Sequence, residues 1–382
     1  MGRRLGAAIN VALVFVSIAF AFGLAELGAW IWVSKFRPEH LTRWEFRATQ
    51  PPPYQDASYF SPDFLAEADV GVSGRITDVL ELRDFRGRYI NIADGFRVTT
   101  DAPANAERRV LLFGGSTLFG QEVPDRYTIA SHLQRMLNEQ GVRWRVRNFG
   151  MPGMNAAQQT LILKRVPLRS GDIVVYYDGV NDIYYLVFGG HRDGWVGGTP
   201  AFRPVQKLSA LHKWLHAWHE RLKDYSYTAQ VALDIYQRGR PNTVTDAQVL
   251  RRALTHTESS FRFALVEAER LSKAAGATFV HFLQPTAYAN AVLTPYEQVI
   301  LKNPLQTPPG LEQAFREGYP RLQRVATELA GKGIEYHDIS DALDGRPAGS
   351  EVFLDFCHIN HEGNRLVAQR MMDIYFLPLL VR

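Results

Sequence analysis

Short runs of β-forming residues alternate with helical patterns from Arg109 onward in this 382-residue chain, and this alternation constrains the fold more than any other feature. Apolar residues recur at helical spacing over 129–137 and again from Asp246 to about Gly276. Strands are predicted between and beside these helices at 110–113, 145–149, 173–177, 278–283 and 334–337. Such alternation is typical of parallel βαβ units. The sequence therefore predicts an α/β protein, a three-layer α/β/α sandwich around a five-stranded parallel sheet.

The N-terminus carries an apolar stretch long enough to cross a membrane. It runs uncharged from Leu5 to Ala25 and resumes beyond Glu26. About twenty apolar residues in a helix span about 30 Å, the thickness of one hydrocarbon core. We expect residues 6–34 to be a transmembrane signal anchor. A cleaved signal peptide and a buried helix of a soluble domain are the alternatives.

Basic residues flank this stretch on both sides, with Arg3 and Arg4 before it and Lys35 and Arg37 after it. The positive-inside count therefore leaves the orientation open. Large domains translocate largely regardless of their charge. We accordingly expect residues 1–5 in the cytoplasm and a single-pass membrane protein whose main domain is extracytoplasmic, in the periplasm.

The rest of the chain divides into an extension and a main domain. Residues 35–107 read as a linker and N-terminal extension, in which Asp94-Gly95 predicts a hairpin turn that packs on the following domain. Residues 108–382 form the predicted α/β domain. The stretch of chain between its third and fourth strands has far more residues than one crossover needs. We therefore predict that residues from about 184 to 242 are an insertion.

Charge and cysteine content exclude some classes of function. The chain has 43 Lys and Arg against 39 Asp and Glu, without a basic stripe, so nucleic acid is not an expected partner. Its single cysteine, Cys357, cannot form an intrachain disulfide and leaves the redox compartment open.

Chemistry-bearing residues follow the ends of the predicted strands, where open α/β sheets bind their ligands. Gly114-Gly115-Ser116 ends the first strand, and taken alone it reads as an ordinary helix cap. A serine nucleophile needs a base with an orienting carboxylate. Among the histidines only His358 follows an aspartate, Asp355, by three residues, on a loop after the last strand.

Two further strand ends offer donors for a developing oxyanion. Gly153 follows the second strand and can bring its backbone N–H close to a ligand, and Asn181 follows the third strand with a side-chain amide. Taken singly, each is more typical of turn chemistry.

Together these positions resemble the four blocks of the SGNH hydrolase superfamily, the GDSL-type esterases, over roughly 109–380. Gly-x-Asn-Asp and Asp-x-x-His are intact, whereas the common Gly-Asp-Ser is Gly-Gly-Ser here. The resemblance implies a flavodoxin-like fold, Ser116 as nucleophile, His358 as base and Asp355 as its orienting partner. It also implies an oxyanion hole made by Ser116, Gly153 and Asn181.

We therefore expect a membrane-anchored serine esterase that removes small acyl groups, acetyl above all, from cell-envelope or secreted carbohydrate. The same acyl-enzyme would serve a polysaccharide O-acetyltransferase, and a non-catalytic polysaccharide-binding subunit of an envelope assembly stays open as a third reading. No cofactor or metal is expected, because the apolar stripe around His212, His216 and His219 favours a packed amphipathic helix. Aromatic residues of the insertion form either its own core or a lid that stacks on sugar rings.

Overall fold

The computed structural model describes residues 2–36, 52–71, 74–76, 80–188, 195–196, 199–200, 226–228, 231, 247–289, 292–302 and 310–381. The chain divides into two compact units. One comprises residues 1–51 and 205–241, and the other comprises residues 52–204 and 242–382. The second unit holds the sheet and every predicted site residue.

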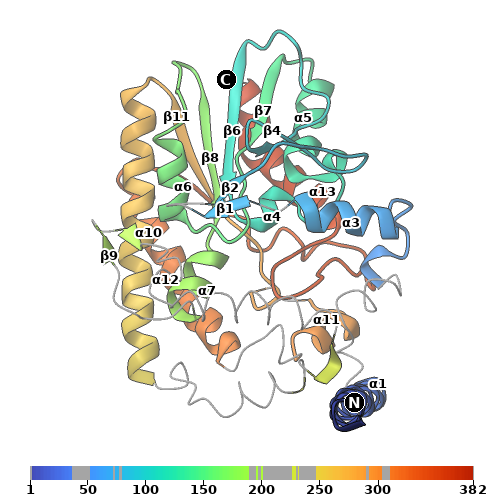
Figure 1. Cartoon of the computed structure of the whole chain (residues 1–382). Helices are drawn as coiled ribbons and strands as arrows, with labels where there is room; N and C mark the ends of the chain where they lie inside the picture. The colour runs from blue at the N-terminus through green and yellow to red at the C-terminus, as the bar shows by residue number, and fades with distance from the viewer. Residues whose placement is uncertain are drawn as a thin grey trace. The chain divides into compact units, whose positions relative to one another are not determined.

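The sheet of the second unit has five parallel strands in the order β12-β11-β8-β6-β7 (Figure 1). The strands are β6 (Arg108–Gly114), β7 (Trp144–Asn148), β8 (Ile173–Asp178), β11 (Thr278–Leu283) and β12 (Glu335–Asp338). The central strand β8 is buried along its whole length. Parallel strands covered on both faces read as continuous runs of Val, Ile and aromatic residues. All five predicted strands are confirmed, with bounds shifted by at most two residues.

Helices cover both faces of this sheet. One apolar core lies between the sheet and α6 (Ala156–Leu163), α7 (Val180–Phe188), α10 (Ala247–Ala274) and α12 (Leu311–Ala330). The other lies between the sheet and α5 (Ile129–Glu139) and α13 (His361–Met371), which continues through a π-helical turn (Met372–Phe376) into α14 (Leu377–Val381). The three-layer sandwich is therefore confirmed.

Residues 52–100 form the N-terminal part of the second unit. A 3₁₀ turn (Pro52–Tyr54) and α3 (Pro62–Gly71) precede the strand pair β1 (Gly74–Ile76) and β2 (Leu80–Leu82). Strands β3 (Phe85–Arg86), β4 (Asn91–Ala93) and β5 (Phe96–Arg97) form an antiparallel sheet. The hairpin between β4 and β5 turns at Asp94-Gly95, as predicted, and both residues have positive φ.

One arginine ties this extension to the sheet unit. Arg97 of β5 is buried and forms an ion pair of 2.6 Å with Asp125. Its guanidinium also donates to the carbonyl oxygens of Phe119, Gly120 and Val123. These carbonyls lie at the last residue of the short helix α4 (Ser116–Phe119) and just after it, so the extension supports the segment that carries Ser116.

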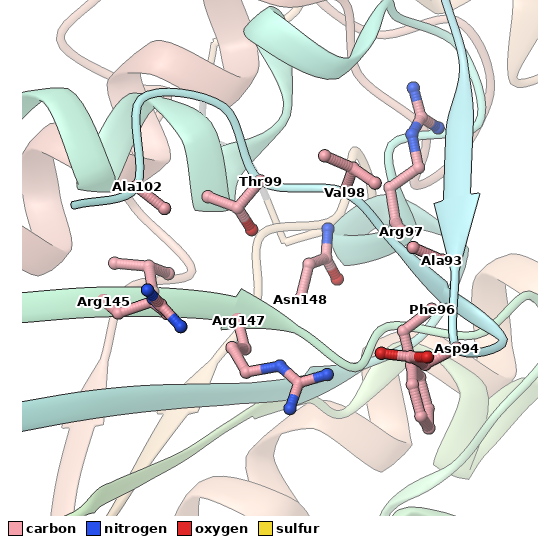
Figure 2. Close-up of a pocket in the computed structure, with 11 residues that line it drawn as sticks. Ala93, Asp94, Phe96, Arg97, Val98, Thr99, Ala102, Arg145, Arg147 and Asn148 are labelled. Carbon is pink, nitrogen blue, oxygen red and sulfur yellow. The ribbon is translucent and has the colours of Figure 1, made fainter. Parts of the chain in front are cut away.

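The extension also crosses the edge strand β7, where it encloses a cavity of about 180 Å³. Figure 2 shows Arg147 of β7 extending toward Asp94, with Arg145 beside it. Arg145 donates to the carbonyl oxygens of Pro103 and Ala104. Burial lowers the pKa of Arg147, and the carboxylate of Asp94 opposes that shift. The polar groups of this cavity mainly fasten the extension to the sheet edge.

The first unit contains α1 (Gly2–Phe36), whose segment Ala12–Trp32 is long and apolar enough to cross a membrane. Glu26 interrupts this apolar surface. Its carboxylate accepts hydrogen bonds from the hydroxyl of Ser226 at 2.9 Å, from the backbone N–H of Thr228 at 3.2 Å and from that of Tyr227. Part of the predicted insertion therefore contacts the N-terminal helix. The insertion also contains the pair β9 (Trp195–Val196) and β10 (Thr199–Pro200).

Candidate active site

Ser116 lies at the turn between β6 and α4, at the carboxyl edge of the sheet. This turn is tight because a side chain does not fit at either preceding position. A Cβ on Gly114 would lie 2.7 Å from the carbonyl oxygen of Tyr177, and one on Gly115 would lie 2.3 Å from Nδ2 of Asn181. The two glycines therefore let the strand turn directly into the helix and present the hydroxyl of Ser116, which is 9% exposed, to the sheet edge.

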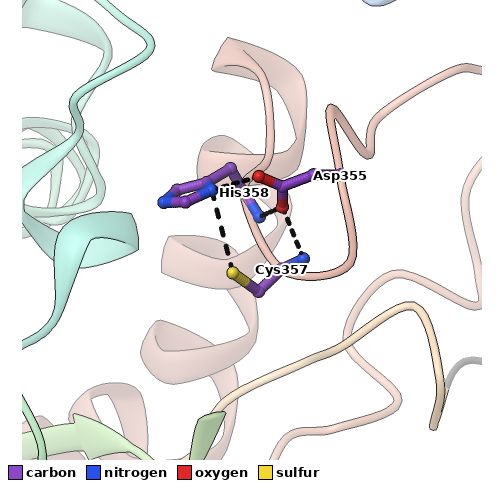
Figure 3. Close-up of side chains that lie close together, drawn as sticks. All are labelled: Asp355, Cys357 and His358. Carbon is purple, nitrogen blue, oxygen red and sulfur yellow. Dashed lines mark hydrogen bonds and ion pairs between the residues drawn. The ribbon is translucent and has the colours of Figure 1, made fainter. Parts of the chain in front are cut away.

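Ser116, His358 and Asp355 form one chain of hydrogen bonds. Nε2 of His358 lies 2.7 Å from Oγ of Ser116, although the two residues are 242 positions apart. On the other side of the ring, Nδ1 lies 2.5 Å from Oδ2 of Asp355 (Figure 3). The second carboxylate oxygen, Oδ1, accepts the backbone N–H groups of Cys357 and His358 at 2.8 and 2.7 Å. The carboxylate thus fixes both the loop and the imidazole orientation.

Opposing effects set the protonation states of this chain. Burial alone disfavours the charged imidazole, but the adjacent carboxylate of Asp355 outweighs burial and holds the pKa of His358 well above 6.5. Burial likewise tends to raise the pKa of Asp355. The imidazolium charge and the hydrogen bonds from residues 357 and 358 outweigh it and lower that pKa to about 2. Asp355 is therefore a carboxylate throughout the physiological range.

A buried ion pair supports the loop that carries Asp355 and His358. Glu297, on α11 (Pro295–Ile300), accepts the backbone N–H groups of Val352 and Phe353 at 3.0 Å and pairs with the guanidinium of Arg346. The loop then closes on itself, because the N–H of Leu354 donates to the carbonyl oxygen of His358 at 2.8 Å. These contacts hold the loop in one conformation at the sheet edge.

The structure brings Gly153 and Asn181 to the same edge as Ser116. Gly153 has φ +77, a left-handed conformation that favours glycine. Nδ2 of Asn181 donates to the carbonyl oxygen of Met154 at 2.7 Å, which uses one of its two N–H groups. The other N–H of this amide is a candidate donor to a ligand. Asn181 also adjoins Gly115, the residue before Ser116, since Nδ2 lies 2.3 Å from a Cβ placed on Gly115.

Two residues of this region escaped the sequence analysis as contributors to the site. Met154 orients the amide of Asn181 through its carbonyl oxygen. Asp182 is buried and accepts the backbone N–H of Ala156, at the start of α6. That contact steadies the loop of Gly153. Asp182 is the last residue of the Gly-x-Asn-Asp motif, so the sequence contained a sign of its importance. Only the structure shows which group its carboxylate binds.

Tyr185, one of the insertion's aromatic residues, lies at the same edge. It lies one helical turn after Asn181, so both side chains share a face of α7. Its hydroxyl would lie 2.9 Å from a Cβ placed on Gly153. Burial raises the pKa of Tyr185, and the charges of Tyr184, Cys357 and His358 act on it as well. The phenol therefore stays protonated against the loop that carries Gly153.

An aromatic group borders the other side of the triad. The ring of Tyr184 stacks on Phe356 with centroids 5.4 Å apart, and Tyr288 lies 6.4 Å from the same ring. Both tyrosines are partly exposed. Of the insertion's aromatic residues, for which we left open a lid or the insertion's own core, Tyr184 and Tyr185 lie beside the site residues. The side chains of the others (Phe188, Trp195, Phe202, Trp214 and Trp218) lie outside the described residues, as do His212, His216 and His219.

The donor atoms of Asp355, Cys357 and His358 lie within 4.8 Å of one another, a spacing that can hold a metal ion (Figure 3). Two observations disfavour that use. Both nitrogens of His358 already have partners, Asp355 and Ser116. Burial raises the pKa of the Cys357 thiol to about 11, which keeps it protonated, whereas metals bind the thiolate. The donor set fits a proton relay better than a metal site.

Fold and site together define an α/β/α sandwich with a Ser–His–Asp chain at the carboxyl edge of a parallel sheet. No protein-family model matches the chain, and no curated protein matches it.

Solved structures are similar at a distance. A member of the lipolytic protein G-D-S-L family from Veillonella parvula has 14% identity and a TM-score of 0.40, over 70% of this chain and 98% of that one. An acetylxylan esterase from Geobacillus stearothermophilus has 11% identity and a TM-score of 0.37, over 70% of this chain and 94% of that one. An alpha/beta hydrolase from the Lake Arreo metagenome also has 11% identity and a TM-score of 0.37, over 70% of this chain and 94% of that one. Similarity this distant concerns the fold alone and does not establish the function of this chain.

Proposed function

We propose that this protein is a serine ester hydrolase with a Ser–His–Asp acyl-enzyme mechanism. One observation carries the proposal: Nε2 of His358 lies 2.7 Å from Oγ of Ser116 while Asp355 binds Nδ1 of the same ring. A serine hydroxyl becomes nucleophilic when an adjacent base takes its proton. The carboxylate keeps the proton of the imidazole on Nδ1, which leaves Nε2 as the base.

The proposed reaction has two halves. Oγ of Ser116 attacks the ester carbonyl carbon while Nε2 of His358 takes its proton. The resulting oxyanion is bound by the N–H groups of Ser116, Gly153 and the Asn181 amide. The carbon–oxygen bond to the alcohol then breaks, and His358 protonates the leaving alcohol. A water molecule, deprotonated by the same imidazole, releases the carboxylic acid and restores Ser116.

The substrate and location belong to the same proposal. Small acyl groups, acetyl above all, on cell-envelope or secreted carbohydrate fit a site bordered by partly exposed aromatic rings such as Tyr184 and Tyr288. The acetylxylan esterase among the similar structures acts on an acetylated sugar polymer by its name. The apolar segment Ala12–Trp32 would anchor the protein in the membrane, with the sheet unit extracytoplasmic.

Active-site labelling tests the mechanism. A fluorophosphonate probe forms a covalent bond only with an activated serine, so the wild-type protein should be labelled and Ser116→Ala should not. Hydrolysis of 4-nitrophenyl acetate should follow the same pattern. Absence of both labelling and hydrolysis in folded wild-type protein would show that the arrangement is not catalytic and would favour a non-catalytic carbohydrate-binding role. Transfer of the acetyl group to an acceptor sugar, rather than to water, would identify an O-acetyltransferase.

A further inference from the structure

A groove with a volume of about 440 Å³ lies where the extension meets the segment that follows α4. Its walls come from four parts of the chain that are distant in sequence, including residues 58–59, 88–91 and 124–126. Its floor includes the buried ring of Tyr59, and the half-buried ring of Tyr89 lines one side. The groove therefore combines aromatic surface with polar walls.

Two exposed arginines give this groove a positive charge. Arg88 and Arg126 both line it, and within the described part of the chain neither forms an ion pair with an acidic side chain. Their guanidinium groups lie over neighbouring rings, 5.2 Å from the centroid of Tyr89 and 4.5 Å from that of Tyr127. Such stacking holds a guanidinium in place and leaves its N–H groups able to donate.

The carboxylate among the lining residues does not cancel this charge. Asp125 is buried, and it accepts hydrogen bonds from Nε of Arg97 at 2.6 Å and from Nδ2 of Asn91 at 2.8 Å. Since Arg97 neutralises Asp125, the charges of Arg88 and Arg126 remain uncompensated by the groove itself.

Two carboxylates near the groove are also engaged elsewhere. Glu67 accepts the backbone N–H groups of residues 88, 89 and 90 at 2.9, 2.7 and 3.1 Å. Asp101 accepts the hydroxyl of Thr100 at 2.8 Å and pairs with Arg135 at 3.5 Å. In the described residues, therefore, neither of these carboxylates forms an ion pair with Arg88 or Arg126.

The groove is connected through hydrogen bonds to the segments that carry the proposed catalytic residues. The hydroxyl of Tyr59, on its floor, lies 3.3 Å from Nδ1 of His361, which begins α13 three residues after His358. On the opposite wall, Asp125 is bonded to Arg97, which also donates to the carbonyl oxygens at the end of α4. These two contacts link the groove to the segments that carry His358 and Ser116.

We propose that this groove is a subsite for the carboxylate of an acidic sugar, so that the preferred substrate is an acylated, uronate-containing oligosaccharide. The proposal rests on the proposed ester hydrolase function. A guanidinium binds a carboxylate through two parallel hydrogen bonds. Tyrosine presents an apolar face to the ring of a sugar, and the amide of Asn91 offers polar contact to its hydroxyls.

Calorimetric titration of the full-length protein in detergent micelles tests the subsite directly. Oligogalacturonate is the acidic probe and a neutral xylo-oligosaccharide is the comparison. We expect the wild type to prefer the acidic probe, and we expect added salt to weaken its binding. The double variant Arg88→Ala/Arg126→Ala should bind oligogalacturonate about 10- to 100-fold more weakly, because each lost charged hydrogen bond costs about tenfold or more. Arg86→Ala, an exposed arginine outside the groove, is the matched control and should bind as the wild type does.

Three results would overturn the subsite. These are equal binding of neutral and acidic oligosaccharides, wild-type affinity in the double variant, and arginine-dependent binding of inorganic phosphate or phosphatidylglycerol vesicles in place of oligogalacturonate. The last result would identify a phosphate site instead.

Kinetics separates this proposal from the hydrolase proposal. The ratio of kcat/KM for acetylated oligogalacturonate to kcat/KM for 4-nitrophenyl acetate should fall about tenfold or more in the double variant. Turnover of 4-nitrophenyl acetate without binding of oligogalacturonate would overturn the subsite and leave the hydrolase function standing. Binding without turnover of either ester or fluorophosphonate labelling would overturn the hydrolase function, and with it the groove's role in choosing a substrate.

Discussion

The side-chain amide of Asn181 donates a hydrogen bond of 2.7 Å to the carbonyl oxygen of Met154. This bond links two of the strand-end segments, because Met154 follows Gly153 directly. It turns the second N–H of the amide in a fixed direction and removes the need to orient it during the reaction. Preorganised donors of this kind supply much of the rate enhancement in acyl transfer.

Gly115 is required for this arrangement, and its substitution should impair turnover. A Cβ at residue 115 would lie 2.3 Å from Nδ2 of Asn181, so Gly115→Ala must displace the amide. We expect kcat to fall about 10²- to 10³-fold, the usual cost of one oxyanion donor. Gly345→Ala is the matched control, because nothing lies within 4 Å of a Cβ at residue 345. Unchanged kcat in Gly115→Ala would show that Asn181 is not a donor in the reaction.

The pH dependence of the reaction should report His358. The imidazole acts as a base only when neutral, and Asp355 holds its pKa well above 6.5. We therefore expect kcat/KM to fall as the pH drops through a value above 6.5. In Asp355→Asn the attraction to the imidazolium is lost while burial remains, so this limb should move to lower pH. The rate at its plateau should fall by up to about 10⁴-fold, because the imidazole loses its oriented tautomer.

The pH–rate profiles of the wild type and Asp355→Asn, measured with 4-nitrophenyl acetate, check both statements. A limb at the same pH in the two proteins would mean that Asp355 does not set the protonation of His358.

Cys357 lies beside the proposed base but should not take part in the reaction. Burial raises its pKa to about 11, so the thiolate that would act as a nucleophile is scarce at neutral pH. We expect Cys357→Ala to keep kcat within an order of magnitude and to keep its fluorophosphonate labelling. Abolished labelling in Cys357→Ala, with labelling retained in Ser116→Ala, would reverse the assignment of the nucleophile.

The sheet and the strand-end positions were predictable because both leave local marks in the sequence. Strands such as β8 and β11 are almost wholly buried, so they read as nearly continuous apolar runs. The strand ends carry glycines that tight turns require, and the carboxyl ends of parallel strands meet at one edge. The expectation that Ser116, Asp355 and His358 would meet there followed from this topology, and their hydrogen bonds are found in the structure. Their catalytic roles stay a prediction.

Other helices, strands and contacts could not be predicted from the sequence. Helix α12 went unpredicted, and Pro320 inside it disguises its helical pattern. Helix α3 and the strands β1, β2 and β3 of the extension also went unpredicted, and aromatic contacts among residues such as Tyr54, Tyr59 and Phe64 hold that part together. The bonds of Met154 and Arg97 join residues far apart in sequence. Only the folded chain shows them.

The extension should prove essential to the stability of the sheet, because its residue Arg97 is buried against Asp125 and the carbonyl oxygens at the end of α4. Arg97→Ala would leave Asp125 buried without its cation, and breaking a buried pair costs about 3–5 kcal/mol. We expect the free energy of unfolding to fall by about this amount, measured by denaturant unfolding of the full chain. Arg97→Lys keeps the charge but loses donors to the carbonyl oxygens, so an intermediate loss is expected. Arg86→Ala, on an exposed position, should change stability by less than about 0.5 kcal/mol.

Tyr185 should limit the length of the acyl group. Its hydroxyl lies 2.9 Å from the position of a Cβ on Gly153, so the phenol ring is next to one of the proposed oxyanion donors. Tyr185→Ala would open that space, and each methylene that then fits is worth about 10-fold or more in discrimination. We expect the ratio of kcat/KM for 4-nitrophenyl butyrate to that for the acetate to rise about tenfold. Tyr185→Phe keeps the ring and should keep the wild-type ratio, which separates the ring's size from its hydroxyl. An unchanged ratio in Tyr185→Ala would place the acyl group elsewhere in the site.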